Sequence, residues 1–351
     1  MSILEQIEEI PKSDPDAGRE ARRHWDRLAK PLGSLGELEG IVARIASLTG
    51  SPDVRIRRRG LWVFCADNGV IVQGVSQSDA SVTEAVAKAL GEGRSTVCYM
   101  AAGLSCPVYP VDIGMCCERT PLGVRNLRVL PGTRDISSGP AMRRKDCLIA
   151  MERGFRLAVE ARSDGMDLLL AGEMGIGNTT TSTAVLSVLL GQPPVSLTGR
   201  GAGLSTDGLN KKIQIIAQAI ERNHPDPSDP VDVLTKVGGL DLAALCGFYL
   251  GSAYARLPVI LDGLISCAAA LCAVRLCPAA GNALIASHCS AEPASSLVLR
   301  SLELSPLISA GLRLGEGSGA VAALPLLDLA LRVYHSGHTF ETIGIDAYHP
   351  L

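Results

Sequence analysis

An apolar run that leads into glycines and a carboxylate is the first candidate for chemistry in this sequence. The segment Leu169–Thr181 reads LLAGEMGIGNTTT. This pattern predicts a strand, a glycine loop and the start of a helix, an order that aims backbone N–H groups at an anion. Glu173 lies in the predicted loop and would place an acid beside that anion. The segment therefore indicates chemistry on a phosphorylated small molecule, although an ordinary turn that needs glycine for a positive φ also fits.

A second carboxylate lies between two glycines nearer the C-terminus. Glu316 is flanked by Gly315 and Gly317, directly ahead of an apolar run that we predict to be a helix. A carboxyl group in such a tight turn can be partly desolvated, which raises its pKa toward that of a useful general base. The alternative is a solvent-exposed glutamate near a helix N-terminus, where its charge would be mildly stabilising.

The elements that must position these residues alternate between two types along the chain. Apolar, β-rich runs are separated by helical patterns, and this alternation predicts a parallel α/β sheet. We expect strands at Leu61–Ala66, Pro107–Asp112, Asp167–Ala171, Pro258–Asp262 and Asn282–Ser287. The expected helices include Val82–Ala102, Ile149–Arg162, Thr181–Leu190, Leu209–Glu221, Gly263–Val274 and Gly319–His335.

Five polar or glycine-rich segments directly follow predicted strands. They are Ala66–Gly69, Asp112–Gly114, Gly172–Asn178, Asp262–Gly263 and Ser287–Pro293. Ligands of open α/β sheets bind at the carboxyl edge of the strands, so these segments are expected to share one site. The aspartates among them are tempting metal ligands, but strand-end aspartates more often accept hydrogen bonds from loop backbones. We therefore predict no metal.

Composition narrows the class of protein. Hydrophobic residues make up 47% of the 351 and aromatic residues only 3%, so the core must be built from Ala, Val, Leu and Ile, which suits a parallel sheet covered by helices. The net charge of −3 and the lack of a long basic run argue against nucleic acid as a partner. No run is apolar enough for a membrane span. The eleven cysteines do not match zinc spacings and suggest reduced thiols, which predicts a cytoplasmic protein.

Ten motifs in one order give the chain a family resemblance. LAGEMGIGNTTT and LRLGEGSGA resemble the nicotinate-nucleotide:dimethylbenzimidazole phosphoribosyltransferase family, whose enzymes activate the lower ligand of cobamides. The other motifs are KPLGSLGELE (Lys30–Glu39), ADNGVIVQGVS (Ala66–Ser76), VDIGM (Val111–Met115), GPAM (Gly139–Met142), TGRGAGL (Thr198–Leu204), VGGLDLAAL (Val237–Leu245), PVILDGLIS (Pro258–Ser266) and SHCSAEP (Ser287–Pro293). The resemblance covers nearly the whole chain.

The resemblance implies transfer of phosphoribose from nicotinate mononucleotide to an aromatic acceptor base, without a cofactor. Nicotinate bonded through its ring nitrogen is cationic and is therefore a good leaving group. The acceptor loses a proton as its nucleophilic atom attacks the anomeric carbon, and the product is an α-ribotide for cobamide assembly. Glu316 matches the family's general base. Glu173 matches a second carboxylate, which would stabilise positive charge developing on the sugar.

The resemblance also implies which residues bind the substrates. The donor's phosphoribosyl group is expected to contact Gly175, Gly177, Asn178, Thr179, Ser290 and Lys212. Arg200 and Gly201 are further anion candidates, and we expect substrate contacts from Ser78, Asp79, Met174 and Gly315. Lys212 follows Lys211, so an exposed helix face is the alternative for it. His288 is expected to be structural.

Three departures from the family's common pattern bear on the acceptor. Asn68 stands where histidine is common, Asp79 where proline is common, and Ala294–Ser295 where Gly-His is frequent. A polar Asp79 disfavours a purely apolar pocket for two ring methyl groups. Another azole, a purine or a phenol is therefore an alternative acceptor. An alternative of another class is a non-catalytic subunit of an active paralogue.

The ends of the chain predict a smaller unit beside the sheet. Residues 1–50 show helical segments and no strand, and the last helix could return to pack against them. We therefore expect a three-layer α/β/α domain with a Rossmann-like sheet over residues 51–318, and a small helical domain from residues 1–50 and 319–351. The expected assembly is a dimer, either of two identical chains or of this chain and a paralogue.

Overall fold

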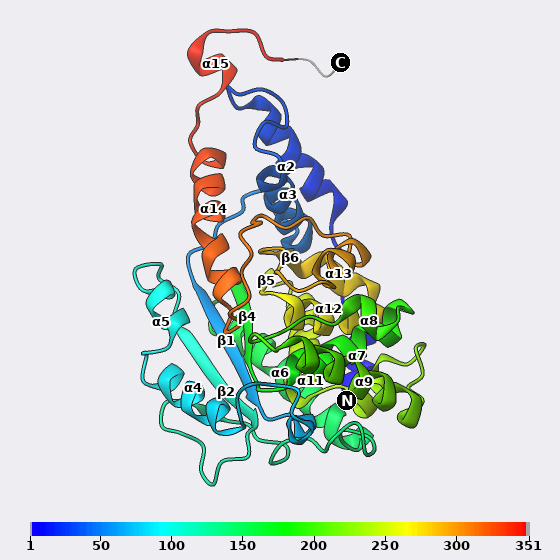
Figure 1. The fold of residues 1–351 in the computed structure, drawn as a ribbon. Helices are drawn as coiled ribbons and strands as arrows, with labels where there is room; N and C mark the ends of the chain where they lie inside the picture. The colour runs from blue at the N-terminus through cyan, green and yellow to red at the C-terminus, as the bar shows by residue number, and fades with distance from the viewer. Residues whose placement is uncertain (1, 349–351) are drawn as a thin grey trace.

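The protein is built around a six-stranded parallel sheet, as seen in a computed structural model that describes residues 2–348 (Figure 1). The strand order is β3-β2-β1-β4-β5-β6, the order of a doubly wound Rossmann-like sheet. The strands are β1 (Arg59–Ala66), β2 (Val108–Gly114), β3 (Arg125–Asn126), β4 (Leu168–Met174), β5 (Val259–Leu261) and β6 (Leu284–Ala286). The predicted α/β class with a parallel sheet is confirmed.

Side chains of β1 show why the sheet has a layer of helices on each face. Successive residues of a strand point to opposite faces. Leu61 and Val63 belong to one buried cluster, whereas Trp62 and Phe64 belong to the other, and all four are buried. A strand that is apolar on both faces cannot leave either face in water, so both are covered.

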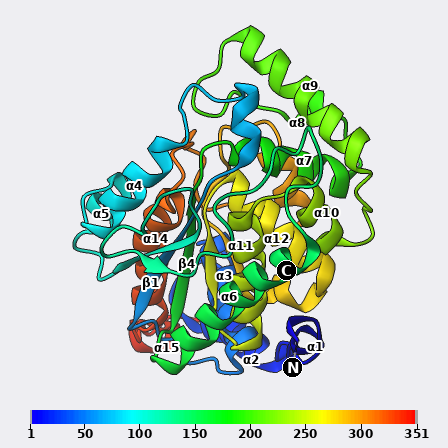
Figure 2. The same ribbon diagram turned by 90° about the horizontal axis from the view of Figure 1, so that it is seen from below.

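Two groups of helices cover the two faces of the sheet (Figures 1 and 2). One group contains α6 (Arg144–Ser163), α7 (Asn178–Leu190), α8 (Pro194–Leu197), α9 (Thr206–Asn223), α10 (Pro230–Val237), α11 (Leu240–Tyr254), α12 (Leu264–Leu276) and α13 (Ser295–Ser301). The other contains α2 (Pro15–Arg27), α3 (Glu37–Thr49), α4 (Ser81–Gly91), α5 (Thr96–Ala101) and α14 (Ser318–Tyr334). None of the described helices is both long and apolar enough to cross a membrane.

The N-terminal and C-terminal helices pack together. The Trp25 ring of α2 packs edge-on against Tyr334 of α14, with ring centroids 4.9 Å apart. His24 Nε2 lies 2.6 Å from the Tyr334 carbonyl oxygen. The short α1 (Ile3–Glu8) packs instead against α6 and α11, and α15 (Phe340–Ile343) follows α14. The division into a helical and an α/β domain stays a prediction, and its residues 1 and 349–351 lie outside the described residues.

Several expected elements have different bounds. The predicted helix Val82–Ala102 is two helices, because Gly93 has a left-handed φ of +70° and Ser95 caps the second helix. Strand β4 continues three residues beyond its predicted end, through Met174. Two 3₁₀ helices, η1 (Gly69–Gln73) and η2 (Pro278–Ala283), complete the described elements.

Candidate active site

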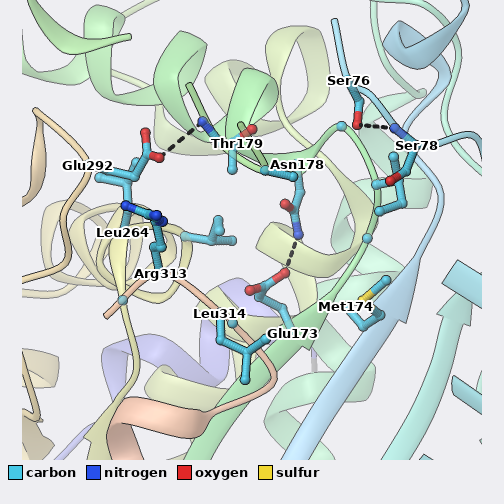
Figure 3. Close-up of a pocket in the computed structure, with 18 of the residues that line it drawn as sticks. Ser76, Ser78, Glu173, Met174, Asn178, Thr179, Leu264, Glu292, Arg313 and Leu314 are labelled. Carbon is cyan, nitrogen blue, oxygen red and sulfur yellow. Dashed lines mark hydrogen bonds between the residues drawn. The ribbon is translucent and has the colours of Figure 1, made fainter. Parts of the chain in front are cut away.

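Loops at the carboxyl ends of the strands enclose a cleft of about 300 Å³ (Figure 3). The cleft lies where the strand order reverses between β1 and β4, which is the usual ligand site of such sheets. Of the predicted site residues, all but Lys212 and Asp79 line it: Ser78, Glu173, Met174, Gly175, Gly177, Asn178, Thr179, Arg200, Gly201, Ser290, Gly315 and Glu316. The structure therefore brings together segments that are far apart in the sequence.

Glu173 is part of strand β4, and its expected place in a loop is wrong. The ladder between β1 and β4 continues past it, because Glu173 pairs with Phe64 and Met174 with Cys65. The Glu173 side chain is buried, and one oxygen accepts a hydrogen bond from Asn178 Nδ2, which reaches it from the start of α7 (Figure 3). Burial and the nearby carboxylates of Asp241 and Asp262 raise the pKa of Glu173 to about 8.

A tight turn of three left-handed residues places Glu316. Gly315, Glu316 and Gly317 have φ angles of +87°, +59° and +84°. A left-handed φ is rare for a side-chain-bearing residue, so the contacts around Glu316 must hold it there. Its own N–H donates to the Glu173 carbonyl at 3.1 Å. The turn therefore rests directly on strand β4.

Asp262 holds the other side of the same turn. This buried aspartate follows β5 and accepts hydrogen bonds from the N–H groups of Gly317 at 3.1 Å and Gly319 at 2.7 Å. Glu316 Oε2 accepts the Val97 N–H of α5 at 3.3 Å, and the residue is only 7% exposed. The alternative of a solvent-exposed turn glutamate is therefore excluded.

The two loop glycines ahead of α7 are needed for different reasons. Gly177 caps the helix with a φ of +93°, as the turn pattern predicts. Gly175 does not have a positive φ, so the conformational reason expected for it is wrong. Its requirement is space: a Cβ there would overlap the Ala66 carbonyl oxygen and come within 2.9 Å of Asp241 Oδ2.

Lys212 lies beneath the second glycine loop and is fully buried. Its Nζ donates to Thr179 Oγ1 at 2.8 Å and to the Gly199 carbonyl at 3.3 Å. Burial lowers its pKa to about 8, against the opposing effect of Glu292. The alternative of an exposed helix face is therefore wrong, and the ammonium group braces α7 and the Gly199–Gly201 loop together.

The neighbouring residues of that loop are held by other polar groups. The Gly201 N–H donates to Glu292 Oε1 at 3.1 Å. Arg200 donates to the Leu204 carbonyl at 2.8 Å and lines the cleft. This part of the cleft thus has the Arg200 side chain and the Glu292 carboxylate in its lining, with the buried Lys212 ammonium group behind them.

Asp79 lies outside the cleft lining. It is exposed and accepts a hydrogen bond from the Ser81 N–H at 2.9 Å, just ahead of α4. Its neighbour Ser78 does line the cleft, and the Ser78 N–H donates to Ser76 Oγ at 3.2 Å. The expected contact of Asp79 with the acceptor stays a prediction.

Comparison with known proteins agrees with these features. A family model described as phosphoribosyltransferase matches residues 10–345. A nicotinate-nucleotide–dimethylbenzimidazole phosphoribosyltransferase of Ruminiclostridium cellulolyticum is 42% identical over the full length of both chains. One from Escherichia coli is 39% identical over 95% of this chain and 94% of its own. The crystal structure of CobT from Thermus thermophilus has a TM-score of 0.90 at 38% identity, covering 95% of this chain and all of that one.

The chain belongs to the nicotinate-nucleotide–dimethylbenzimidazole phosphoribosyltransferase family. The resemblance inferred from the motifs is confirmed over the whole chain.

In this member of the family, the cleft is also lined by residues that were not predicted as functional, and four of them lie next to the predicted site residues or their loops. Asp262, Glu292, Arg313 and Leu314 all line the cleft. All four residues fall in motifs that carry the family resemblance, and this position in the sequence was the signal that could have identified them. His288 also lines the cleft, is buried, and has Nδ1 2.9 Å from Ser287 Oγ.

The strand-end aspartates hold loops, as expected. Asp67 accepts the Cys116 N–H at 2.7 Å, and Asp112 accepts the Met115 N–H at 2.9 Å and forms an ion pair with Arg128. Within residues 2–348, no three His, Cys, Asp or Glu side chains are grouped so that they could hold a metal ion.

Proposed function

We propose that this chain transfers the phosphoribosyl group of nicotinate mononucleotide to 5,6-dimethylbenzimidazole or a closely similar base. The products are nicotinate and an α-ribotide for cobamide synthesis. The observation that carries the proposal is the pairing of two buried carboxyl groups, Glu173 and Glu316, in one cleft beside a glycine loop and a helix start. The family membership of the chain supports the same reaction.

The donor binds with its phosphate at the helix start and the two glycine loops. Gly177 caps α7, Thr179 belongs to its first turn, and Gly201 belongs to the facing loop. The N-terminus of a helix favours negative charge. Lys212 supports this region from below through its bond to Thr179, and Arg200 adds a second cation at the rim. Ser290 lines the same cleft and can donate a hydrogen bond.

Glu316 takes the acceptor's proton. The ring nitrogen of the acceptor attacks the anomeric carbon, and the bond from that carbon to the nicotinate nitrogen breaks with its electron pair staying on nitrogen. The acceptor ring then gives up its remaining N–H proton to Glu316. One oxygen of Glu316 is held by the Val97 N–H, which orients the other toward the proton it removes.

Glu173 has a different role at neutral pH. Its pKa of about 8 leaves the carboxyl mostly protonated at pH 7. A neutral carboxyl donates a hydrogen bond instead of supplying negative charge. The stabilisation of the sugar by a negative charge on Glu173, which the family resemblance implies, therefore does not operate at neutral pH.

The alternatives lack a supporting observation of their own. A non-catalytic subunit would not need the buried pair of Glu173 and Glu316, which is present. A purine or phenol acceptor was suggested by three departures from the family pattern, Asn68, Asp79 and Ala294–Ser295, and none of these residues lines the cleft. The dimer, and the choice between identical chains and a paralogous partner, stay part of the proposal, as does the cytoplasmic location.

An acceptor panel tests the proposed reaction. The purified chain is incubated with nicotinate mononucleotide and with 5,6-dimethylbenzimidazole, other azoles, purines or phenols, and products are identified by mass. We expect one α-ribotide per nicotinate released, with dimethylbenzimidazole among the best acceptors. If the chain transfers phosphoribose only to phenols or purines, the proposed acceptor is wrong. If it binds the donor but transfers phosphoribose to no base, the proposed reaction is wrong.

A further inference from the structure

Asp241 is a buried acid directly behind the cleft. It lies at the start of α11, is 0% exposed, and is not among the residues that line the cleft. It therefore cannot touch a substrate. Its Oδ1 accepts the Leu242 N–H at 2.9 Å, and this bond ties the carboxyl group to the first turn of a 15-residue helix.

A single amide connects Asp241 to the cleft. Asn178 Nδ2 donates one hydrogen to Asp241 Oδ2 at 3.1 Å and the other to Glu173 Oε2 (Figure 3 shows the second bond). Carboxylates only accept hydrogen bonds, so both acids turn the NH₂ group of Asn178 toward themselves. Two oxygens that share one nitrogen donor lie within about 6 Å of each other.

Two acids this close in a buried site do not both ionise at neutral pH. Asp241 ionises more readily than Glu173, because its carboxylate is stabilised by the Leu242 N–H and the helix N-terminus in addition to Asn178. Among residues 2–348, the donor to Glu173 Oε2 is Asn178 alone. Its Oε1 lies beside Gly315 of the cleft wall, where a Cβ would come within 2.8 Å, so a proton on Oε1 faces the cleft side.

We propose that Asp241 is a positioning residue: through Asn178 it orients the Glu173 carboxyl group, and its negative charge keeps that carboxyl protonated. The part that concerns catalysis rests on the proposed phosphoribosyl transfer. Glu173 then presents an O–H group to the substrate, and Glu316 remains the only base of the pair. The assignment gives a function to Asp241, the aspartate of the VGGLDLAAL motif. From the sequence alone, this residue cannot be distinguished from an aspartate that only caps a helix.

Other charged groups also face Glu173, and they determine how far the pKa of Glu173 falls when the Asp241 charge is removed. Asp262 approaches from the loop after β5 and Glu316 from the turn before α14, and both add to the effect of burial and Asp241 in raising the pKa of Glu173. Asn178 on α7 opposes them. Asp241 in turn faces Asn178 and Asn68. Removing the Asp241 charge alone therefore lowers the pKa of Glu173 without restoring an ordinary value.

The test reads the protonation of Glu173 directly in the full chain without substrate. Glutamate labelled with ¹³C at its carboxyl carbon is incorporated, and Glu173→Gln identifies the Glu173 resonance. In Asp241→Asn we expect the Glu173 titration midpoint to move down by about one pH unit. The matched control is Asp67→Asn, which alters another buried acid at the same sheet edge that does not bond Asn178. It should leave the midpoint in place.

The single-turnover rate of nicotinate release supplies the second readout. We expect the wild-type rate to fall above about pH 8 as Glu173 loses its proton, and this alkaline limb to begin at lower pH in Asp241→Asn. A merely structural role for Asp241 would lower the rate without moving the limb.

The outcomes distinguish failure of the role proposed for Asp241 from failure of the proposed phosphoribosyl transfer. An unmoved Glu173 midpoint in folded Asp241→Asn would overturn the inference even if transfer occurs. If that variant fails to fold, the wild-type titration still decides, because a Glu173 midpoint in the ordinary carboxyl range of about 4–5 excludes the inference. A shifted midpoint in a chain that transfers no phosphoribose would support the role of Asp241 and remove the proposed function instead.

Discussion

The two carboxyl groups of the cleft differ in what surrounds each of them. Glu173 is faced by the acids Asp241 and Asp262 and holds its proton at neutral pH. Glu316 receives a backbone N–H from Val97 and is fixed in a left-handed turn. Pairs of acids whose environments differ in this way divide the acid and base roles of a reaction.

Replacement of Glu316 by glutamine tests its role as the base. Glu316→Gln keeps the size of the side chain but cannot take a proton. We expect the single-turnover rate to fall about 10²–10⁴-fold, or roughly 3–5 kcal/mol of barrier. Donor affinity should change little, because the glycine loops hold the phosphate. A folded, donor-binding variant that keeps more than about half the wild-type rate would exclude Glu316 as the base.

Lys212 makes a separate prediction about donor binding. Lys212→Met removes the buried charge that joins Thr179 to the Gly199–Gly201 loop, and we expect donor affinity to fall about 10–100-fold because the two anion-binding segments lose this connection. Because burial lowers the Lys212 pKa to about 8, the wild-type affinity should also decline as the pH rises past that value. Lys211→Met, one residue away and exposed, is the matched control. Calorimetry with nicotinate mononucleotide measures both, and equal affinities would place Lys212 outside the donor site.

At the scale of elements, the close packing of loops on strand ends fixes the site. The Gly315–Gly317 turn contacts β4 so closely that a Cβ at Gly172 would come within 2.5 Å of the Gly317 nitrogen. The first glycine loop packs in the same way on the end of β1, where Gly175 meets Ala66. Backbone packing at two strand ends therefore sets the distance between the carboxyl groups and the donor loop.

A methyl group at Gly175 should displace that loop. In Gly175→Ala the new Cβ overlaps the Ala66 carbonyl, and relief of such overpacking costs roughly 1–3 kcal/mol. We expect donor binding to weaken about tenfold or more, with the sheet intact by circular dichroism. Gly139→Ala serves as the control, since a Cβ there meets nothing within 4 Å and its φ is not positive. If Gly175→Ala binds the donor with wild-type affinity, the loop that contains Gly175 does not bind the donor's phosphate.

Sequence patterns identified the long elements and the strand-end segments, because both depend on local signals. The five predicted strands are present, but only three of the segments expected to share a site line the cleft: Gly172–Asn178, Asp262–Gly263 and Ser287–Pro293. Strand β3 was not predicted, because it consists of only two residues, Arg125 and Asn126, and both are polar and exposed. Helix α11 was not among the expected helices: it is buried on all sides and so lacks an amphipathic period.

The finer properties of the site depend on tertiary contacts that no local pattern records. The place of Glu173 within β4 follows from its pairing with β1, more than a hundred residues earlier. The link from Asn178 to Asp241 joins two helices 63 residues apart in sequence. Burial of Lys212 likewise depends on the loop packed above it and not on its own helix pattern.

For the whole molecule, the buried acids link stability to pH. The folded-state pKa of Glu173, about 8, is raised above the ordinary value of 4.5, so the folded state holds a proton that the unfolded chain has released. Its stabilising contribution is therefore complete below the unfolded pKa and is lost as the pH rises through the folded one. Asp241 and Asp262 shift in the same direction, to about 6 and about 7, chiefly because of burial.

The free energy of unfolding should therefore fall as the pH rises from about 5 to 8. A single group contributes a slope of about 1.4 kcal/mol per pH unit in the window between its two pKa values. In Glu173→Gln, which cannot titrate, we expect a shallower decline, measured by urea unfolding at several pH values. Identical slopes in the two proteins would mean that Glu173 does not hold a proton in the folded state.

The most direct test of the central claim is turnover by this chain alone. The purified protein is mixed with nicotinate mononucleotide and 5,6-dimethylbenzimidazole, and nicotinate and the ribotide are quantified together by mass over time. We predict equal amounts of nicotinate and α-ribotide, formed at a rate proportional to the amount of protein and reduced at least about a hundredfold in Glu316→Gln. A folded, donor-binding wild-type chain that forms no ribotide above the protein-free control would contradict the claim.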